Sequence, residues 1–272
     1  MTHHRETLAE RIGRRLVRRL EAPSPGFEPY THANVAALRR VLEPGDVLLV
    51  EGHNRVSIAI KYLTMSTWSH AAMYVGNAVG RVAAEGEALT LVEVNLGEGC
   101  VAVPLSKYER FNTRICRANA LSPEERARVV DFMVGSLGKS YDMKNIFDLL
   151  RYFLPTPPVP VRWRRRMLAF GSGDPTRAIC SSLLAQAFEH VRYPVLPRIT
   201  AEFRADAAAR HQRREILEIR HHSLYAPRDF DLSPYFHIVK PTLAAGFDHR
   251  ALTWRSPPAA EGGRTRRHGR KS

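Results

Sequence analysis

The sequence lacks the features that would place it in a membrane or in a disulfide-bonded scaffold. No run approaches the ~18 consecutive apolar residues of a membrane-spanning helix, and the residues after Met1 lack the apolar core of a secretory signal. Only three cysteines occur, Cys100, Cys116 and Cys180, so a disulfide framework is excluded and at least one thiol is free. We therefore expect a soluble protein of the reducing cytoplasm.

The short motifs of metal, nucleotide and nucleic-acid chemistry are also missing. There is no His-Glu-x-x-His run, no Cys-x-x-Cys pair, no glycine-rich phosphate loop and no zinc-finger spacing. We therefore expect no metal or other cofactor, and no specific nucleic-acid partner.

What is present is the composition of a globular protein. The 272 residues are 44% hydrophobic and 25% charged, enough chain for one large domain or two small ones with a sizeable core. The formal net charge of +14 lies in residues 1–20, 151–177 and 255–272, which contribute +4, +5 and +5. Because the rest of the chain is neutral, the basic excess belongs to segments outside the globular body.

The chain divides into three regions by composition. Residues 1–43 contain an amphipathic helix and a linker, residues 44–240 form the main domain with a Pro- and Arg-rich insertion at 154–176, and residues 241–272 form a basic, disordered tail. In the first region, Leu8, Ile12, Leu16 and Leu20 recur every four residues with arginines on the other faces. Residues 5–20 either pack on their own domain or lie on an anionic membrane surface as a peripheral anchor, and both interpretations stay open.

The main domain alternates short strands and helices. We expect strands at residues 46–50, 70–75, 90–95, 100–103 and 113–117, and helices at 57–65, from Ser122 to about Leu137, and from Cys180 onward. Short strands joined by glycine turns indicate a small, mostly antiparallel sheet packed against helices, an α+β fold. We also expect a long polar helix at 201–222 in a helical C-terminal extension. A closing turn and strand follow over 229–239, with Asp229 and Asp231 capping the loop.

Cys180 is the most informative residue for chemistry. It begins an apolar helical stripe, so unpaired backbone N–H groups and the helix dipole would stabilise a negative charge there. A cysteine in such a place either has a lowered thiol pKa and acts as a nucleophile, or has a structural role. Cys100 and Cys116 lie in apolar strand patterns, where we expect them to pack.

A thiolate needs a base, and His70 is distinguished among twelve histidines because it opens a strand directly after Ser69. On the strand 90–95, Glu93 shares a face with Leu91 and Asn95, and burial of its carboxylate requires a partner. If the two strands are neighbours, Glu93 accepts a proton from one imidazole nitrogen and leaves the other for the thiol. The alternative is an edge strand with Glu93 in water.

Together these residues resemble a known family. Gly45-Asp46, Ser69-His70, Glu93, the run from Gly138 to Asp142, and Cys180-Ser181 occur in the order found in circularly permuted papain-like cysteine hydrolases. These are the YiiX-like branch of the NlpC-type superfamily, related to lecithin:retinol acyltransferase-like proteins. The resemblance covers roughly residues 44–190, and the segment 154–176 looks long for the family.

The resemblance implies a permuted papain-like fold and a site of three catalytic groups. Cys180 would be the nucleophile, His70 the base and then acid, and Glu93 the group that orients the imidazole. Tyr141, Ser181 and Ser69 would serve the oxyanion or the substrate. The implied activity is that of an amidase or peptidase acting through a thioester.

Two other functions stay open at this point. One is a lipid acyltransferase or phospholipase, suggested by the basic amphipathic helix and by the apolar residues of 147–153. The other is a non-catalytic module that binds a lipid or a peptide. The expected partners are accordingly a peptide, amide or acyl-lipid substrate.

Overall fold

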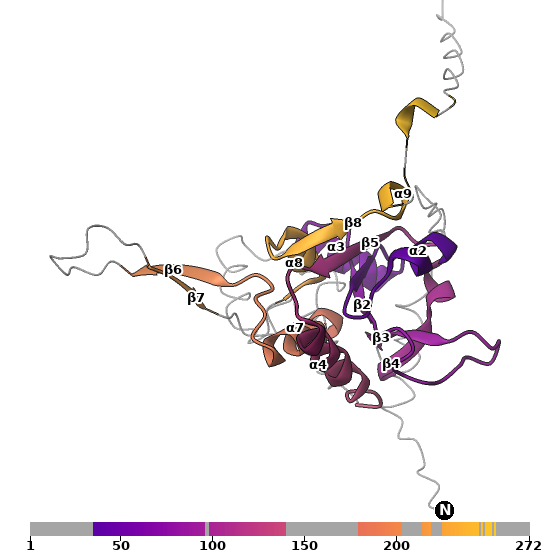
Figure 1. Cartoon of the computed structure of the whole chain (residues 1–272), viewed down its shortest axis with the longest axis horizontal. Coiled ribbons are helices and arrows are strands. Elements are labelled where there is room, and N and C mark those ends of the chain that lie inside the picture. Colours follow the sequence, from indigo (N-terminus) through magenta and orange to yellow (C-terminus); the bar gives the residue numbers. More distant parts are fainter. Residues whose placement is uncertain are drawn as a thin grey trace, which may run out of the picture.

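A six-stranded antiparallel sheet forms the centre of the molecule (Figure 1). The computed structural model describes residues 35–95, 98–139, 179–202, 214–218, 225–244, 246, 248–251 and 253. The strands follow the spatial order β4-β3-β2-β1-β5-β8, and all neighbours are antiparallel. Their bounds are β1 Val47–Val50, β2 His70–Tyr74, β3 Leu89–Asn95, β4 Gly99–Pro104, β5 Thr113–Ala118 and β8 Phe236–Val239.

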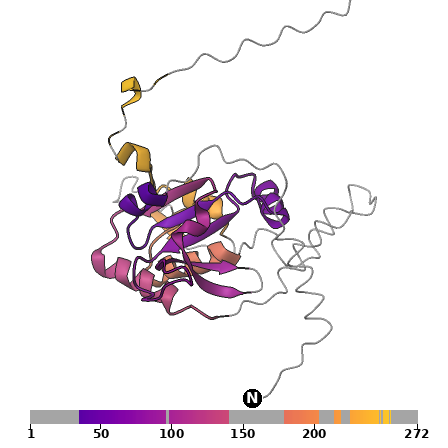
Figure 2. The same cartoon turned by 90° about the vertical axis from the view of Figure 1, so that its right-hand side faces the viewer.

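Helices pack against the sheet from both sides, as the perpendicular views in Figures 1 and 2 show. One apolar cluster joins the sheet to α4, α7 and α8, while a second cluster on the opposite face joins it to α2 and to the 3-10 helix η1. The bounds are α2 Val35–Val41, α3 Arg55–Thr64, η1 Leu105–Tyr108, α4 Pro123–Val134, α7 Ile179–His190, α8 Pro227–Leu232, α9 Pro241–Ala244 and η3 His249–Ala251.

The strand β1 explains why the sheet is covered on both faces. All four of its residues are buried, and they alternate between the two clusters, Val47 and Leu49 on one face and Leu48 and Val50 on the other. This follows from the period of two along a strand. Each such side chain contributes about 1.5–3 kcal/mol by leaving water. A strand that is apolar throughout therefore belongs in the middle of the sheet, where β1 lies.

The predicted α+β fold is confirmed over the sheet. Each of the five predicted strands is present with ends that move by at most one residue, and the predicted helix at 57–65 is α3, which spans Arg55–Thr64. The capping box at α4 is present, since Ser122 accepts from the Glu125 N–H and Glu125 accepts from the Ser122 N–H. The helix ends at Val134, three residues before the predicted end, and Gly135 caps it.

The polar helix predicted at 201–222 is wrong where the structure describes that segment. Strands β6 (Arg198–Glu202) and β7 (Arg214–Glu218) pair in an antiparallel ribbon that extends away from the sheet in Figure 1. The alanines and arginines of this segment favour a helix, but such a local preference is small per residue, and pairing between segments overrides it. The helical extension is thus replaced here by a pair of strands.

The segment 227–239 contains a helix and a strand rather than a turn and a strand. Asp229 accepts a hydrogen bond from the Ala226 N–H at 3.0 Å and so caps the start of α8, close to the predicted capping role. Asp231 instead accepts from the Trp68 indole at 3.0 Å and forms an ion pair with Arg114. The predicted helix at 5–20, the insertion 154–176 and the end of the tail lie outside the described residues.

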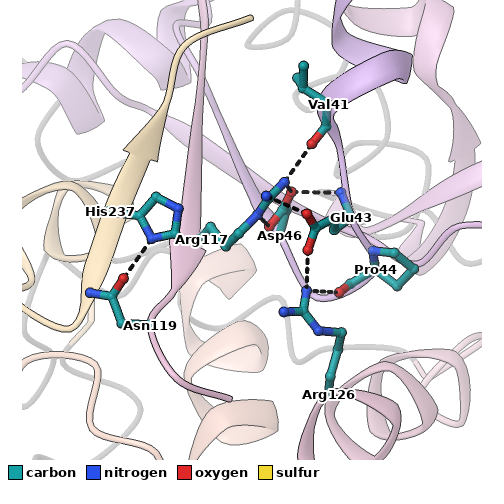
Figure 3. Close-up of polar contacts among 8 residues, drawn as sticks. All are labelled: Val41, Glu43, Pro44, Asp46, Arg117, Asn119, Arg126 and His237. Carbon is teal, nitrogen blue, oxygen red and sulfur yellow. Dashed lines mark hydrogen bonds and ion pairs between the residues drawn. The ribbon is translucent and has the colours of Figure 1, made fainter. Parts of the chain in front are cut away.

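A buried ion pair ties the first turn of the domain to the sheet (Figure 3). Asp46 is fully buried, and the Arg117 guanidinium donates to both of its carboxylate oxygens at 2.8 Å. Arg117 and Arg126 both contact Glu43 as well. Gly45, with φ of +92°, makes this turn possible because an L side chain rarely adopts that conformation. Together these contacts join α2, β1, β5 and α4.

Substitution Asp46→Ala is expected to lower the free energy of unfolding by about 3 kcal/mol, because it leaves the partly buried Arg117 guanidinium without its main partner. Urea unfolding followed by circular dichroism measures this. The exposed Glu109→Ala is the control and is expected to change the free energy by less than about 0.5 kcal/mol. Equal effects of the two substitutions would contradict a structural role for the pair.

Candidate active site

His70 and Glu93 face one another across neighbouring strands. In the register of β2 and β3, Ala72 pairs with Glu93, so His70 lies one position along the same face. His70 Nε2 lies 3.1 Å from Glu93 Oε2. Glu93 is fully buried, whereas 21% of the His70 side chain is exposed. The expected neighbouring strands are therefore present, and the alternative of Glu93 in water is excluded.

Cys180 reaches the same imidazole from the other face of the sheet. It occupies the second position of α7, is 5% exposed and belongs to the apolar cluster under α7. Its sulfur is hydrogen-bonded to the His70 side chain and to the Ala71 N–H, and the Ser181 hydroxyl lies 3.9 Å away. Because Nε2 of His70 faces Glu93, Nδ1 is the nitrogen left for the thiol.

The charges of these groups support one another. Burial raises the pKa of the Cys180 thiol, but the charge and hydrogen bond of His70, together with the Ala71 N–H and the Ser181 hydroxyl, outweigh it and lower that pKa. Burial opposes a charged His70, but the Cys180 thiolate and then Glu93 outweigh it and raise the pKa of His70 to about 10. The favoured form at neutral pH is thus a thiolate beside an imidazolium.

Glu93 stays ionised beside this pair. Burial alone would raise the pKa of its carboxyl group. The hydrogen bond and charge of His70, followed by the charge of Lys107, outweigh burial and lower the pKa of Glu93 to about 2. The carboxylate is therefore charged at neutral pH, where it stabilises the charged imidazole.

A comparison with protein families gives this geometry a context. Residues 41–153 match the model of a family described as permuted papain-like amidases, YaeF/YiiX, the C92 family. The predicted resemblance to circularly permuted papain-like proteins is confirmed over these residues. The matched segment contains His70 and Glu93, while Cys180 lies C-terminal to it. The amidase description supports a hydrolase. No curated protein matches the chain.

The remaining residues suggested by the resemblance lie in different places. Ser181 is fully buried beside the Cys180 sulfur. The Ser69 hydroxyl is also buried and accepts a hydrogen bond from the Gly52 N–H at 2.9 Å, which anchors the loop after β1 next to His70. Tyr141 lies outside the described residues, so its expected role stays a prediction.

The other two cysteines differ from Cys180 in their electrostatics. Both are buried in the sheet, as their apolar strand patterns predict. Burial, the main cause, raises the pKa of Cys100 to about 11 and that of Cys116 to about 12. The charges that act on Cys100 are those of Lys139 and Glu93, and those that act on Cys116 are those of Asp231, Arg114 and Asp46. Cys100 and Cys116 thus provide two internal standards for thiol reactivity.

Two contacts of Glu93 were missed by sequence reasoning. Lys107 Nζ forms an ion pair with Glu93 Oε1, and the Tyr108 hydroxyl donates a hydrogen bond to Oε2. The sequence did carry a signal, because a carboxylate in an apolar strand needs partners. It did not identify them, since both lie on a short 3-10 helix whose direction cannot be read from periodicity.

The described part of the chain contains no helix that is both long enough and apolar enough to cross a membrane. Over the same residues, no cluster of three or more His, Cys, Asp or Glu side chains has the arrangement of a metal site.

Iodoacetamide is expected to alkylate Cys180 faster than the other cysteines. The pH at which the Cys180 alkylation rate is half-maximal, its midpoint, is expected to lie well below the ordinary thiol pKa of ~8.5. Peptide mass spectrometry across a pH series resolves the three cysteines, and Cys100 and Cys116 serve as slow internal controls. His70→Ala is expected to move the Cys180 midpoint to higher pH because the imidazolium is lost. A midpoint that His70→Ala leaves in place would contradict the thiolate–imidazolium pair.

The lowered pKa of Glu93 also predicts how stability depends on acid. A carboxyl group whose pKa falls from 4.5 to about 2 on folding stabilises the protein above pH 4.5, and this contribution is lost as the pH falls toward 2. In urea unfolding, the free energy of unfolding of the parent chain is expected to decline between pH 5 and about pH 3, and Glu93→Gln is expected to remove the part of this decline that Glu93 causes. Substitution of the exposed Glu98 by Gln is the matched control, and its free energy of unfolding is expected to decline with acid as in the parent chain.

Proposed function

We propose that this protein is a cysteine-dependent hydrolase of the amidase or peptidase type that acts through a thioester. The observation that supports this most directly is the hydrogen-bonded line from the Cys180 thiol through His70 to the buried Glu93. A nucleophile, a base within hydrogen-bond reach and a group that orients the base are the elements that thiol acyl transfer requires. The amidase family match over residues 41–153 supports the same reaction class.

In the first half of the proposed reaction, the Cys180 thiolate attacks the carbonyl carbon of the substrate. A carbon–sulfur bond forms, and the carbonyl electron pair moves onto oxygen. The first N–H groups of a helix have no partner within it, so the Cys180 N–H in the first turn of α7 is suited to hold this oxygen. When the oxygen electrons return, the bond to the leaving nitrogen breaks, and the His70 imidazolium gives that nitrogen its proton.

In the second half, water cleaves the thioester. Neutral His70 accepts a proton from the water as its oxygen attacks the acyl carbon, and the carbon–sulfur bond then breaks. The products are a carboxylic acid and the restored thiolate–imidazolium pair. Glu93 holds the imidazole ring in one orientation in both halves and stays ionised.

One observation favours an acyl-lipid substrate as the second candidate. Ile58 and Tyr62 are one helical turn apart on α3, Met65 caps the end of that helix, and the three residues are 47%, 82% and 88% exposed. This apolar stripe follows the loop that Gly52 anchors to Ser69, next to His70. An acyl chain is a ligand that such a surface would accept, and the same thiol chemistry would then cleave or transfer the acyl group.

The proposed function is tested by trapping the acyl-enzyme. A short peptide amide and a long-chain N-acyl amide are each mixed with the protein, and intact mass spectrometry after an acid quench looks for an acyl adduct. We expect an acyl adduct on the parent chain and none on Cys180→Ala. Cys116→Ala is the control: it removes a buried thiol that is not a partner of His70, and we expect this variant to form the adduct. The substrate that gives the adduct decides between the two candidates. Binding of either substrate by Cys180→Ala, without any adduct on the parent chain, would instead indicate a binding module.

A further inference from the structure

The fully buried Glu93 carboxylate is held by more than the imidazole. Its Oε2 atom accepts from His70 and from the Tyr108 hydroxyl, and its Oε1 atom faces the Lys107 ammonium group. These partners come from β2 on one side and from η1 on the other. Lys107 is the most exposed member of this set, with 37% of its side chain accessible to solvent, compared with 21% for His70.

The local structure explains why Lys107 points at the site. Leu105 and Tyr108 are three residues apart on η1, so they lie on the same side of the 3-10 turn, and both are buried in the cluster with Leu91. The Tyr108 ring is fixed by an edge contact with Phe111 at 5.6 Å. Lys107 then extends over that ring, with its nitrogen 5.5 Å from the ring centroid, to reach Glu93.

The sum of charges gives Lys107 a chemical role. A thiolate on Cys180, an imidazolium on His70 and a carboxylate on Glu93 leave one net negative charge in a buried place. The ammonium group of Lys107 balances it. Without this balance, the thiolate and the carboxylate would compete for one imidazolium, and each would bind a proton more readily.

We propose that Lys107 is a positioning residue of the reaction, which holds Glu93 ionised and aimed at His70 through its ion pair with Glu93 Oε1. This inference rests on the proposed thiol chemistry. Lys107 does not touch the reacting atoms and acts through Glu93.

Within the described part of the chain, three other titratable groups act on Glu93 or on its partner His70. From η1, Tyr108 stays a protonated donor, because burial and the charge of Glu93 raise the pKa of its hydroxyl well above 10. From β4, Cys100 feels the Glu93 charge and stays protonated at neutral pH, since its pKa is about 11. His70 lies on β2, and Cys180 acts on it from α7. Lys107 is thus the group whose charge can be removed without altering a hydrogen bond to the thiol.

The test is the pH midpoint of Cys180 alkylation in the full-length protein. Lys107→Gln is expected to move this midpoint upward by about one pH unit, because the loss of a positive charge favours the protonated thiol. Lys107→Arg keeps the charge and is expected to restore a midpoint near that of the parent chain. Lys61→Gln is the matched control, since Lys61 forms an ion pair of 3.1 Å with the largely buried Glu51, outside the contacts of Glu93.

A double-substitution cycle tests whether Lys107 acts through Glu93. In a Glu93→Gln background, Lys107→Gln is expected to move the midpoint much less than in the parent chain. An equal shift in both backgrounds would overturn the proposed route. If Lys107→Gln alone fails to fold, recovery of folding in the double variant supports the charge balance, and continued failure while Lys61→Gln folds overturns it.

The outcomes separate this inference from the proposed function. A parent chain whose Cys180 midpoint is ordinary, and insensitive to His70→Ala, ends the thiol mechanism and this inference with it. A low midpoint that depends on His70 but does not respond to Lys107→Gln leaves the mechanism intact and overturns the role of Lys107 alone.

Discussion

The Glu93 carboxylate is shielded from water, and the protein itself must stabilise its charge. Isolated carboxylates are too costly to bury, so the strand β3 can pass through the core at this point only if cationic and donor groups meet it there. His70 comes from the neighbouring strand, and Lys107 and Tyr108 from the turn that follows β4. The hairpin of β3 and β4 and the position of η1 are therefore linked to the same charge that orients the imidazole.

The two faces of the sheet contribute different parts of the site. Glu93 and Tyr108 belong to the face covered by η1 and α2, whereas Cys180 belongs to the face covered by α4 and α7. His70 opens β2 at the end of the sheet and contacts both. This arrangement keeps the two anions, the carboxylate and the thiolate, on opposite sides of one imidazolium, where their mutual repulsion is smallest.

Sequence patterns identified the parts of the site that depend on regular periodicity. The alternation along 90–95 placed Glu93 on one face, and the apolar stripe after Cys180 placed the thiol at a helix start. Contacts made by irregular segments were beyond such patterns, as Lys107 on η1 shows. The paired strands β6 and β7 were missed because the pairing joins segments separated by residues 203–213, and local composition favoured a helix.

The order of the proposed catalytic groups along the chain has a consequence for biosynthesis. A ribosome releases β1 to β5, with His70 and Glu93, before it releases α7 with Cys180. Most of these strands pair with neighbours in sequence, so they are able to assemble early. Until α7 docks on the finished sheet, the Cys180 sulfur has neither the imidazole nor the Ala71 N–H beside it. Under the proposed mechanism, Cys180 is therefore an ordinary thiol in the nascent chain, and its activation begins only when α7 has docked.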